Sequence, residues 1–401
     1  MFSFVEVEIG EMMKKLIREC PICGNDYGEV YKTIRMKLPQ DVILPDNYEV
    51  VTCEKCGFAY ADVRGTQELY NKYYDNSNVY SMDAVLRKKI IRQRDKSRLE
   101  FIEKTVEKNA RILDVGSGSG ALLILLQQNG FKSLVGLDPS EKSIKNLEKK
   151  GIKGELRNIF DIVPKDMKKQ FDLVCFTAVL EHIYDLNQCI EQLKKYLADD
   201  GKIYIEVPDV EGFWDGKLPV PHYFNQEHIN YFSNISLDNL LNKHGMIVHS
   251  RKSMVVSDVE EVEKTVAVMY KKQDICGEIN KDFIAGQIIK KYFDYIENNQ
   301  KQSYEKLLAF IAGRKVMIWG TGAQAMQLLA DKPEIVNHVI GFVDNNAVKV
   351  GKKILGISIF SPRELLLKDM EYPIIICSMQ CSADIINQMR EMSMKNEYFV
   401  W

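Results

Sequence analysis

The chain of 401 residues has no long apolar run and almost no net charge, and each absence excludes a class of function. No apolar segment approaches the roughly 20 residues that a membrane-spanning helix needs, so we expect no membrane insertion. The N-terminus lacks a basic segment followed by an apolar one, so we expect no signal peptide. The net charge of −2 gives no electrostatic reason for nucleic-acid binding. We therefore expect a cytoplasmic protein that binds no nucleic acid.

Cysteine is not scarce, but its spacing argues against disulfides. Four of the nine cysteines form two Cys-x-x-Cys-Gly pairs, which are Cys20, Cys23, Cys53 and Cys56. Each pair places two thiols on one tight turn, and two pairs supply four sulfur ligands to one Zn²⁺. A redox role is the alternative, and two glycine-flanked copies argue against it. Because four protein ligands leave no open position, we predict a structural zinc in a zinc-ribbon-like domain at residues 1–66.

The most informative stretch is a strand, a glycine turn and a helix start at residues 112–120, followed by a second strand at residues 134–140. The second strand ends in Asp138, whose carboxylate can accept both hydroxyls of a ribose. The glycines do not follow the Gly-x-Gly-x-x-Gly spacing of dinucleotide sites. Asp114, at the end of the first strand, would repel a pyrophosphate and attract an ammonium group. The residues therefore favour S-adenosylmethionine (SAM) over NAD.

This stretch resembles motif I of the class I SAM-dependent methyltransferases. Residues 170–176 are similar to the fourth strand of that family, and residues 179–183 to the Leu-Glu-His segment that follows it. The resemblance implies an α/β fold with a central Rossmann-like sheet over residues 110–273, preceded by a helical lid or connector at 67–109. It implies a cofactor site made of Asp114, Gly116, Ser117, Gly118, Gly120, Asp138, Pro139, Asn158 and Ile159. In this set the glycine turn and Asp114 hold the methionine end, and Asn158 and Ile159 flank the adenine.

A second strand, glycine turn and helix start lie at residues 315–325, and a further strand ends in Asp344. This pattern fits the dinucleotide fingerprint, but residues 314–401 are too few for a complete dinucleotide fold. We therefore expect a small C-terminal Rossmann-like domain for docking or for cradling the substrate, with an NAD or other nucleotide site as the alternative. The helical residues 274–313 are expected to connect it to the central sheet.

The chemistry is expected beyond the carboxyl ends of the strands, where the loops of a doubly wound sheet gather. Histidine is the natural base at neutral pH, and we predict His228 as the catalytic base. Glu227 is the helper or second candidate, and His182 is the third. The alternatives are a capping or packing role for His228 and a structural or cofactor-adjacent role for His182. The expected substrate-binding residues are Tyr74, Tyr80, His222, Tyr223, Asn225 and Tyr231.

The three-part order of the chain resembles the sugar C-methyltransferases that act on nucleotide-linked deoxysugars. The pair Glu227-His228 and the run at residues 231–233 match that family, whereas its preceding Tyr-His is replaced by Asn225-Gln226. Its C-terminal glycine turn is present at residues 320–325 without the usual lysine. The resemblance implies a methyltransferase for a sugar or nucleotide-linked sugar, at carbon or oxygen, and we expect a monomer or a homodimer. The alternatives are another small or lipid-linked acceptor and a non-catalytic SAM-binding scaffold.

Overall fold

The protein divides into two compact units. The computed structural model describes residues 13–39, 42–76, 88–216, 218–258, 261–275, 277–378 and 381–401. The first unit comprises Met1–Lys32, Glu49–Gly216 and Glu227–Ile289. The second comprises Thr33–Tyr48, Lys217–Gln226 and Lys290–Trp401. The five-segment division expected from the sequence stays a prediction.

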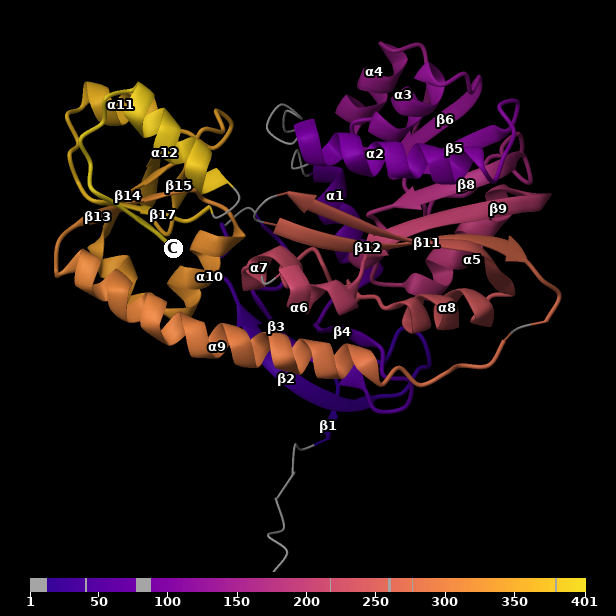
Figure 1. Cartoon of the computed structure of the whole chain (residues 1–401), viewed down its shortest axis with the longest axis horizontal. Coiled ribbons are helices and arrows are strands. Elements are labelled where there is room, and N and C mark those ends of the chain that lie inside the picture. The colour runs from indigo at the N-terminus through magenta and orange to yellow at the C-terminus, as the bar shows by residue number, and fades with distance from the viewer. Residues whose placement is uncertain are drawn as a thin grey trace, which may run out of the picture. The chain divides into compact units, whose positions relative to one another are not determined.

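A seven-stranded sheet forms the centre of the first unit, with the order β11-β12-β9-β8-β5-β6-β7 (Figure 1). The strands are β5 (Arg111–Val115), β6 (Ser133–Asp138), β7 (Lys153–Leu156), β8 (Phe171–Thr177), β9 (Leu197–Pro208), β11 (Met246–Asp258) and β12 (Glu261–Lys272). The strands β5 to β9 are parallel, and β12 runs antiparallel between β9 and β11. If the seven strands are numbered by their order in the chain and read from β7 to β11, their order in the sheet is 3-2-1-4-5-7-6. The predicted α/β class with a class I methyltransferase sheet is confirmed.

Helices cover both faces of this sheet because the strands are apolar on both sides. They are α2 (Lys88–Glu103), α3 (Ala121–Gln128), α4 (Glu141–Glu148), α5 (Leu186–Tyr196) and α8 (Asn234–Lys243). Successive residues of a strand face opposite sides. Accordingly, Ile112 belongs to a core shared with α2, α3 and α4, whereas Leu113 and Val115 belong to a core shared with α5 and α8. The helix α5 begins where the Asp185 carboxylate accepts the backbone N–H of Gln188.

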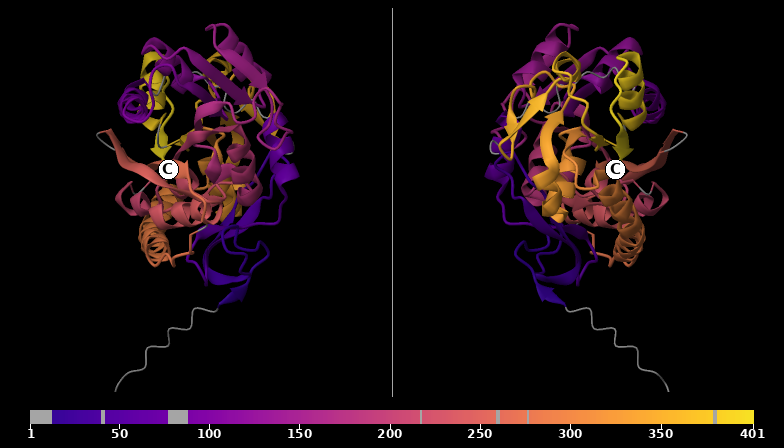
Figure 2. Two further views of the ribbon diagram at one scale, coloured as in Figure 1. Left: turned by 90° about the vertical axis from the view of Figure 1, so that its right-hand side faces the viewer. Right: turned by 90° about the vertical axis from the view of Figure 1, so that its left-hand side faces the viewer.

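The cysteine-bearing segment forms a second sheet in the order β1-β2-β3-β4-β10. Its strands are β1 (Lys14–Lys15), β2 (Tyr27–Arg35), β3 (Asn47–Cys53), β4 (Ala59–Asp62) and β10 (Asn230–Tyr231). Figure 2 shows β1 to β4 in indigo from two further sides. The last strand comes from the segment after β9, and Tyr231 pairs with Ala59 in antiparallel register. The sequence did not predict this pairing.

Arg18 fastens this sheet to the segment that carries β10. Its guanidinium is buried and donates to the backbone carbonyls of Tyr184 at 2.8 Å and Ile229 at 3.1 Å. It also donates to the Asn230 side chain at 3.1 Å and lies 4.5 Å from the centre of the Tyr184 ring. A guanidinium fixes several acceptors at once because its donors form a rigid fork. Arg18 therefore links the segment before the first cysteine pair to the segments around residues 184 and 229–230.

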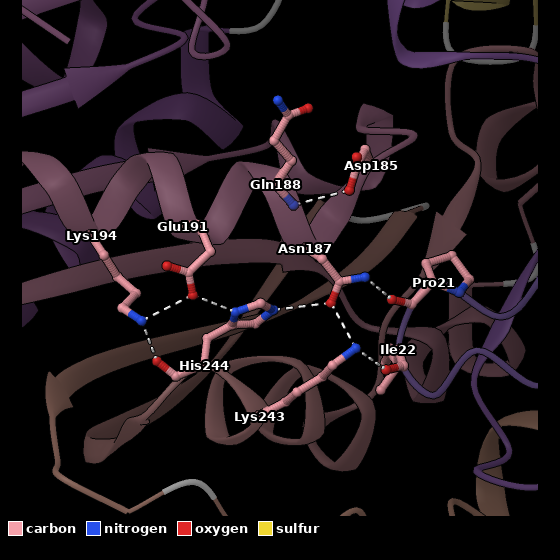
Figure 3. A network of polar contacts seen from close by, with 9 residues as sticks. All are labelled: Pro21, Ile22, Asp185, Asn187, Gln188, Glu191, Lys194, Lys243 and His244. Carbon is pink, nitrogen blue, oxygen red and sulfur yellow. Dashed lines mark hydrogen bonds and ion pairs between the residues drawn. The ribbon is translucent and has the colours of Figure 1, made fainter. Parts of the chain in front are cut away.

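A second set of polar contacts joins the first cysteine pair to α5 and α8 (Figure 3). Lys243, at the end of α8, donates to the Ile22 carbonyl at 2.8 Å and to the Asn187 side chain at 2.9 Å. Asn187, on α5, donates to the Pro21 carbonyl at 2.7 Å. Pro21 and Ile22 lie between Cys20 and Cys23. The turn that carries these thiols is thus held by the helices of the large sheet.

The second unit holds a six-stranded sheet in the order β15-β16-β14-β13-β17-β18. Its strands are β13 (Val316–Trp319), β14 (Val339–Val343), β15 (Lys353–Ile354), β16 (Ile357–Phe360), β17 (Ile374–Ile376) and β18 (Tyr398–Val400). The helices include α10 (Ala323–Asp331), α11 (Pro362–Leu367) and α12 (Ser382–Glu391). The strands β13 and β14 lie where the sequence predicted them, and β15 and β16 were not predicted.

Two helical segments differ from the expectation. In the region expected to be helical from residue 274, the helix among the described residues, α9 (Ile284–Ile311), begins only where the Asp282 carboxylate accepts the N–H of Ile284 at 2.9 Å. The loop expected after β9 contains short helical turns, including α6 (Phe213–Gly216) and α7 (Val220–Tyr223). Among the described residues, no helix combines the length and the apolar character needed to cross a membrane.

Candidate functional site

A cavity of about 150 Å³ lies at the carboxyl ends of β5, β6 and β8 in the first unit. Six of the nine residues predicted to bind the cofactor line it, and these are Gly116, Gly118, Asp138, Pro139, Asn158 and Ile159. Asp114, Ser117 and Gly120 are not part of its wall. The two predicted side chains Tyr74 and His182 line the same cavity. The site thus joins a glycine turn, a carboxylate and a histidine around one space.

The glycine turn gives a ligand direct access to the backbone. Gly116 has φ = 72°, and a Cβ there would lie 2.6 Å from a methyl group of Val179. Gly118 has φ = 50°, and a Cβ there would meet no atom within 4 Å. Both conformations favour glycine, and the open space at Gly118 borders the cavity. A bound group can therefore approach the peptide at this turn without a side chain in between.

Asp138 lies at the end of β6, and its carboxylate is held by two backbone donors. One oxygen accepts the N–H of Gly118 at 2.8 Å, and the other accepts the N–H of Ser140 at 2.9 Å. Burial raises the pKa of Asp138, and these two hydrogen bonds oppose that rise. Each carboxylate oxygen can accept more than one hydrogen bond. The fixed carboxylate can therefore still accept the hydroxyl groups of a ligand.

Asp114 lies two residues before Gly116 and is buried in the body of the unit. Burial raises the pKa of Asp114 to about 7, and the nearby Arg98 opposes that rise. One Asp114 oxygen and the Ser117 hydroxyl have no hydrogen-bond partner among the residues that the structure describes. Such buried orphan groups are uncommon and fit an ordered water or a ligand ammonium. Arg98 itself forms a two-point ion pair with Glu206 at 2.6 and 2.8 Å.

On the other wall of the cavity, His182 is held in one tautomer. It lies in the short 3₁₀ helix η2 (Leu180–His182), and its Nδ1 is 3.1 Å from the Glu227 backbone carbonyl and 3.0 Å from the Tyr74 hydroxyl. Because a carbonyl only accepts, Nδ1 carries the hydrogen and Nε2 carries the lone pair. Burial lowers the pKa of His182 to about 4, against the smaller effect of this hydrogen bond. His182 is therefore neutral at physiological pH.

Glu227 and His228 stand next to His182. Tyr73 donates its hydroxyl hydrogen to the Glu227 carboxylate at 2.6 Å. The ring of His228 meets the ring of His182 edge to face, with 4.8 Å between the centres. Asn230 donates to the carbonyl of Ile183 at 2.7 Å and so holds the segment onto η2. The structure thus brings the three predicted catalytic residues together beside the predicted cofactor residues.

Two family models match the chain. Residues 86–250 match a methyltransferase domain, and residues 312–399 match the model named C2185-like, N-terminal. The match of residues 86–250 agrees with the order of the strands in the large sheet. Residues 86–250 match the model of a methyltransferase domain and have the class I methyltransferase fold.

Curated relatives match this methyltransferase domain over part of their length. A ribosomal protein L11 methyltransferase of Aquifex aeolicus is 34% identical over 139 residues, which are 32% of this chain and 54% of that one. A ubiquinone biosynthesis O-methyltransferase of Pelagibacter ubique is 31% identical over 101 residues, or 24% and 42% of the two chains. The chain spans 37% of the L11 methyltransferase of Lactobacillus delbrueckii, at 31% identity. These matches concern the domain and leave the acceptor open.

A solved structure with a bound cofactor is also similar. Magnesium protoporphyrin IX methyltransferase (ChlM) from Synechocystis PCC 6803 with bound SAM has 15% sequence identity and a TM-score of 0.37. The alignment covers 51% of this chain and 96% of that chain.

The four predicted zinc ligands come together next to the methyltransferase domain. The sulfur atoms of Cys20 and Cys56 are 3.5 Å apart, those of Cys23 and Cys53 are 3.4 Å apart, and all four lie within 4.8 Å of one another. Four sulfurs at about 2.3 Å from one zinc would be roughly 3.8 Å apart. The glycine after each pair has a positive φ, 74° at position 24 and 73° at position 57. The cluster therefore has the dimensions of a tetrahedral zinc site.

The predicted substrate residues are distributed more widely than expected. Tyr80 lies outside the described residues. His222, Tyr223 and Asn225 belong to the second unit, where the Tyr223 ring packs edge-on against other aromatic rings. Tyr231 is buried in β10, with its ring edge-on to Phe213. Of the predicted substrate residues that the structure describes, Tyr74 is the one that lines the cavity of the methyltransferase domain.

The sequence analysis missed the contribution of α1 (Gln67–Asn76) to the cavity wall. Gln67 and Asn71 line the cavity together with Tyr74. The Gln67 side chain also accepts the backbone N–H groups of Tyr184 and Asp185, each at 2.9 Å. The spacing of i, i+4 and i+7 places these three residues on one helix face, so periodicity could have identified them.

Proposed function

We propose that this protein is a SAM-dependent methyltransferase that acts on a sugar or nucleotide-linked sugar. One observation carries the proposal: the glycine turn and Asp138 share a single cavity with His182 and Tyr74. A methyl donor held by the first pair would face an acceptor held by the second. Methyl transfer is an in-line displacement, and correct mutual placement of donor and acceptor supplies much of its acceleration.

The residues present fit the cofactor. Asp138 would accept the ribose hydroxyls, Asn158 and Ile159 would flank the adenine, and the turn around Gly118 would pass close to the methionine end, with Asp114 behind it. When bound, SAM supplies an electrophilic methyl group on a sulfonium. The orphan oxygen of Asp114 supports this assignment, because a buried acceptor needs a donor.

The protein must also position the acceptor and remove its proton. We assign the base role to His228, with Glu227 as its partner. The two residues are adjacent in the sequence, and the His228 ring lies against that of His182, which lines the cavity. The hydrogen bond from Tyr73 fixes the Glu227 carboxylate. Positioned acid–base groups of this kind typically contribute 10²–10⁴-fold to a rate.

The sugar acceptor is supported by sequence resemblance. Glu227-His228 and residues 231–233 match the sugar C-methyltransferases; Glu227-His228 precede β10, and the run 231–233 begins at its last residue. The names of the curated relatives refer to ribosomal protein L11 and to ubiquinone biosynthesis, so they do not agree on one acceptor. We propose carbon or oxygen of a sugar as the methylated atom.

The decisive test is a mass-spectrometric turnover assay. The protein is incubated with deuteromethyl-SAM and a panel of nucleotide sugars that includes 4-keto deoxysugars, and the products are searched for the label. A labelled sugar supports the proposal, and the position of the label separates carbon from oxygen. Turnover should fall at least 100-fold in His228→Ala or Glu227→Gln. Binding of SAM without a labelled sugar would rule out the sugar class and favour a lipid-linked or polymeric acceptor.

We also propose that the four cysteines hold one structural zinc ion. Metal analysis of the purified protein should return close to one zinc per chain, and Cys53→Ser should lose it. Cys175→Ser is the matched control, because Cys175 is equally buried and lies outside the cluster. An unchanged zinc content in Cys53→Ser would contradict the assignment.

A further inference from the structure

Three side chains of the methyltransferase domain form a compact cluster beside the cavity. They are Glu181, His182 and His228, and their potential ligand atoms all lie within 4.8 Å of one another. Glu181 and His182 are buried, and His228 is half-buried. Two imidazoles and one carboxylate are a ligand set that binds divalent first-row metals and leaves coordination positions open.

The orientation of His182 suits a metal ligand. Its Nδ1–H is directed at the Glu227 backbone carbonyl, 3.1 Å away, so the lone pair is on Nε2. That Nε2 lies 4.0 Å from a carboxylate oxygen of Glu181. Metal-binding histidines commonly donate their second ring N–H to a carbonyl in this way, because the bond fixes the tautomer and the ring plane. The Nε2 lone pair of His182 and the carboxylate oxygen of Glu181 are therefore close enough to share one ion.

The dimensions are close to those of an occupied site. Two nitrogen or oxygen ligands at 2.0–2.2 Å from one ion can be at most about 4.4 Å apart. The distance of 4.0 Å between Nε2 of His182 and the nearer carboxylate oxygen of Glu181 is already within this limit. A ligand atom of His228 lies within 4.8 Å of those of Glu181 and His182, only slightly beyond this limit.

The backbone that carries the cluster is fixed from two sides. The N–H of Ile229, the residue after His228, donates to the carbonyl of Glu181 at 2.9 Å. The carbonyl of Ile229 accepts from the buried guanidinium of Arg18 at 3.1 Å. These bonds hold the segment of His228 directly opposite η2. Preorganised ligands of this kind lower the cost of binding an ion.

We propose that Glu181, His182 and His228 bind a divalent transition-metal cation, and that its open positions take two adjacent oxygens of the acceptor, such as a vicinal diol or a hydroxy-ketone of a sugar. The inference rests on the proposed function for this second part and refines it. His228 then acts as a ligand, and the acceptor proton passes to the Glu227 carboxylate. The new O–C bond forms as the C–S bond of SAM breaks, with its electron pair remaining on sulfur.

Manganese is the suitable probe, because Mn²⁺ prefers nitrogen and oxygen ligands and does not compete for the thiolate cluster. The full-length, zinc-containing protein is titrated with Mn²⁺ alone, and the free ion is followed by its electron paramagnetic resonance signal. We expect about one Mn²⁺ per chain. Glu181→Gln and His228→Gln keep the side-chain size or polarity and should each weaken binding at least 10-fold.

Two matched variants control the experiment. Glu227→Gln removes a carboxylate next in sequence to His228 but outside the cluster, and His244→Gln removes a histidine that contacts Glu191 elsewhere. Both should bind Mn²⁺ as the unchanged protein does. Equal binding by the unchanged protein, Glu181→Gln and His228→Gln, or no binding by any of them, would overturn the proposal.

Calorimetry with SAM on the same samples separates this inference from the proposed function. SAM binding without Mn²⁺ binding rejects the metal site and leaves the methyltransferase assignment intact. Mn²⁺ binding without SAM binding supports the metal site and rejects the methyltransferase assignment. Retained SAM binding in Glu181→Gln also shows that this variant is folded.

Discussion

The chain contains the same local pattern twice, once in each unit, and the two copies treat their carboxylates differently. In the methyltransferase domain, Asp138 accepts two backbone N–H groups and lines a cavity. In the second unit, Asp344 follows β14, and it accepts both the backbone N–H and the hydroxyl of Thr321. Lys349 adds an ion pair to Asp344 at 3.5 Å. Because the N–H of Asn346 also donates to Asp344, both carboxylates accept two backbone N–H groups, and the ion pair with Lys349 distinguishes the second copy.

The difference lies in which partners satisfy the acid. Each carboxylate accepts two backbone N–H groups and a side-chain hydroxyl hydrogen, and what differs is the Lys349 ammonium, which pairs with Asp344. This contrast supports a cofactor site in the first unit, and it supports the proposal that the second unit serves in docking or in cradling a substrate. Five predictions test the contrast, from the largest expected effect to the smallest.

The ion pairs of the two units should differ most. Arg98 and Glu206 are buried, with 14% and 2% of their side chains exposed, whereas Lys349 is 39% exposed. Removing one partner of a buried pair leaves an uncompensated charge and typically costs about 3–5 kcal/mol. An exposed pair contributes about 0–1 kcal/mol. Urea unfolding should therefore show a large loss of stability in Arg98→Met and a small one in Lys349→Met. Equal losses would contradict the comparison.

The buried acid of the first unit should make stability depend on pH. The folded-state pKa of Asp114 is raised to about 7, so its contribution is fully present below the unfolded pKa of about 3.9 and is lost as pH rises through 7. A shift of this size corresponds to about 4 kcal/mol at most. Unfolding of Asp114→Asn should lack this decline. The free energy of unfolding is measured for both proteins from pH 5 to pH 8. The difference between the two values removes the contribution of the other titrating groups.

The two carboxylates can be compared by cofactor binding. Asp138→Ala should weaken SAM binding at least 100-fold, because hydrogen bonds to a charged acceptor contribute about 1.5–3 kcal/mol each. Asp344→Ala should leave the SAM dissociation constant within a factor of two. Isothermal calorimetry measures both, and a similar loss in the two variants would show that they share one ligand.

The glycines give a smaller effect. Gly116 has φ = 72° and a Val179 methyl 2.6 Å from its missing Cβ, whereas Gly322 is extended and has nothing within 4 Å. Gly116→Ala should therefore lose about 1–2 kcal/mol of stability. Gly322→Ala should be neutral. Thermal unfolding of both variants checks the prediction.

The smallest expected effect is that of NAD. With Asp344 already paired to Thr321 and Lys349, NAD at millimolar concentration should not shift the melting temperature of the protein. If NAD bound with a micromolar dissociation constant and Asp344→Ala abolished that binding, Asp344 would be a nucleotide ligand like Asp138, and the comparison would be contradicted.

The sequence predicted the features that depend on residues close together in the chain. The strands β5 and β6 and the turn between them follow from apolar runs, glycines and an acid within one short stretch, and the structure has them at those residues. The four cysteines converge because each pair is fixed by its own turn. Gln67 and Asn71 were missed although their helical spacing was available.

The remainder depended on partners distant in the chain. Nothing around Ala59 indicates that it pairs with Tyr231, and nothing around Arg18 indicates that its acceptors lie near residues 184 and 229. The same applies to Asp344, whose sequence position suggested a ribose ligand but whose side chain meets Lys349. Periodicity describes one element at a time, and these contacts depend on how elements meet.

The pairing of β4 with β10 also bears on how the chain is made. Arg18 and its acceptor Ile229 are 211 positions apart, so during synthesis the N-terminal strands emerge long before their partner does. Until residues 229–231 leave the ribosome, the edge of β4 is open, and an open strand edge invites association with other chains. Contacts of such long range also slow folding. The N-terminal sheet of this protein is therefore completed late, even though it is translated first.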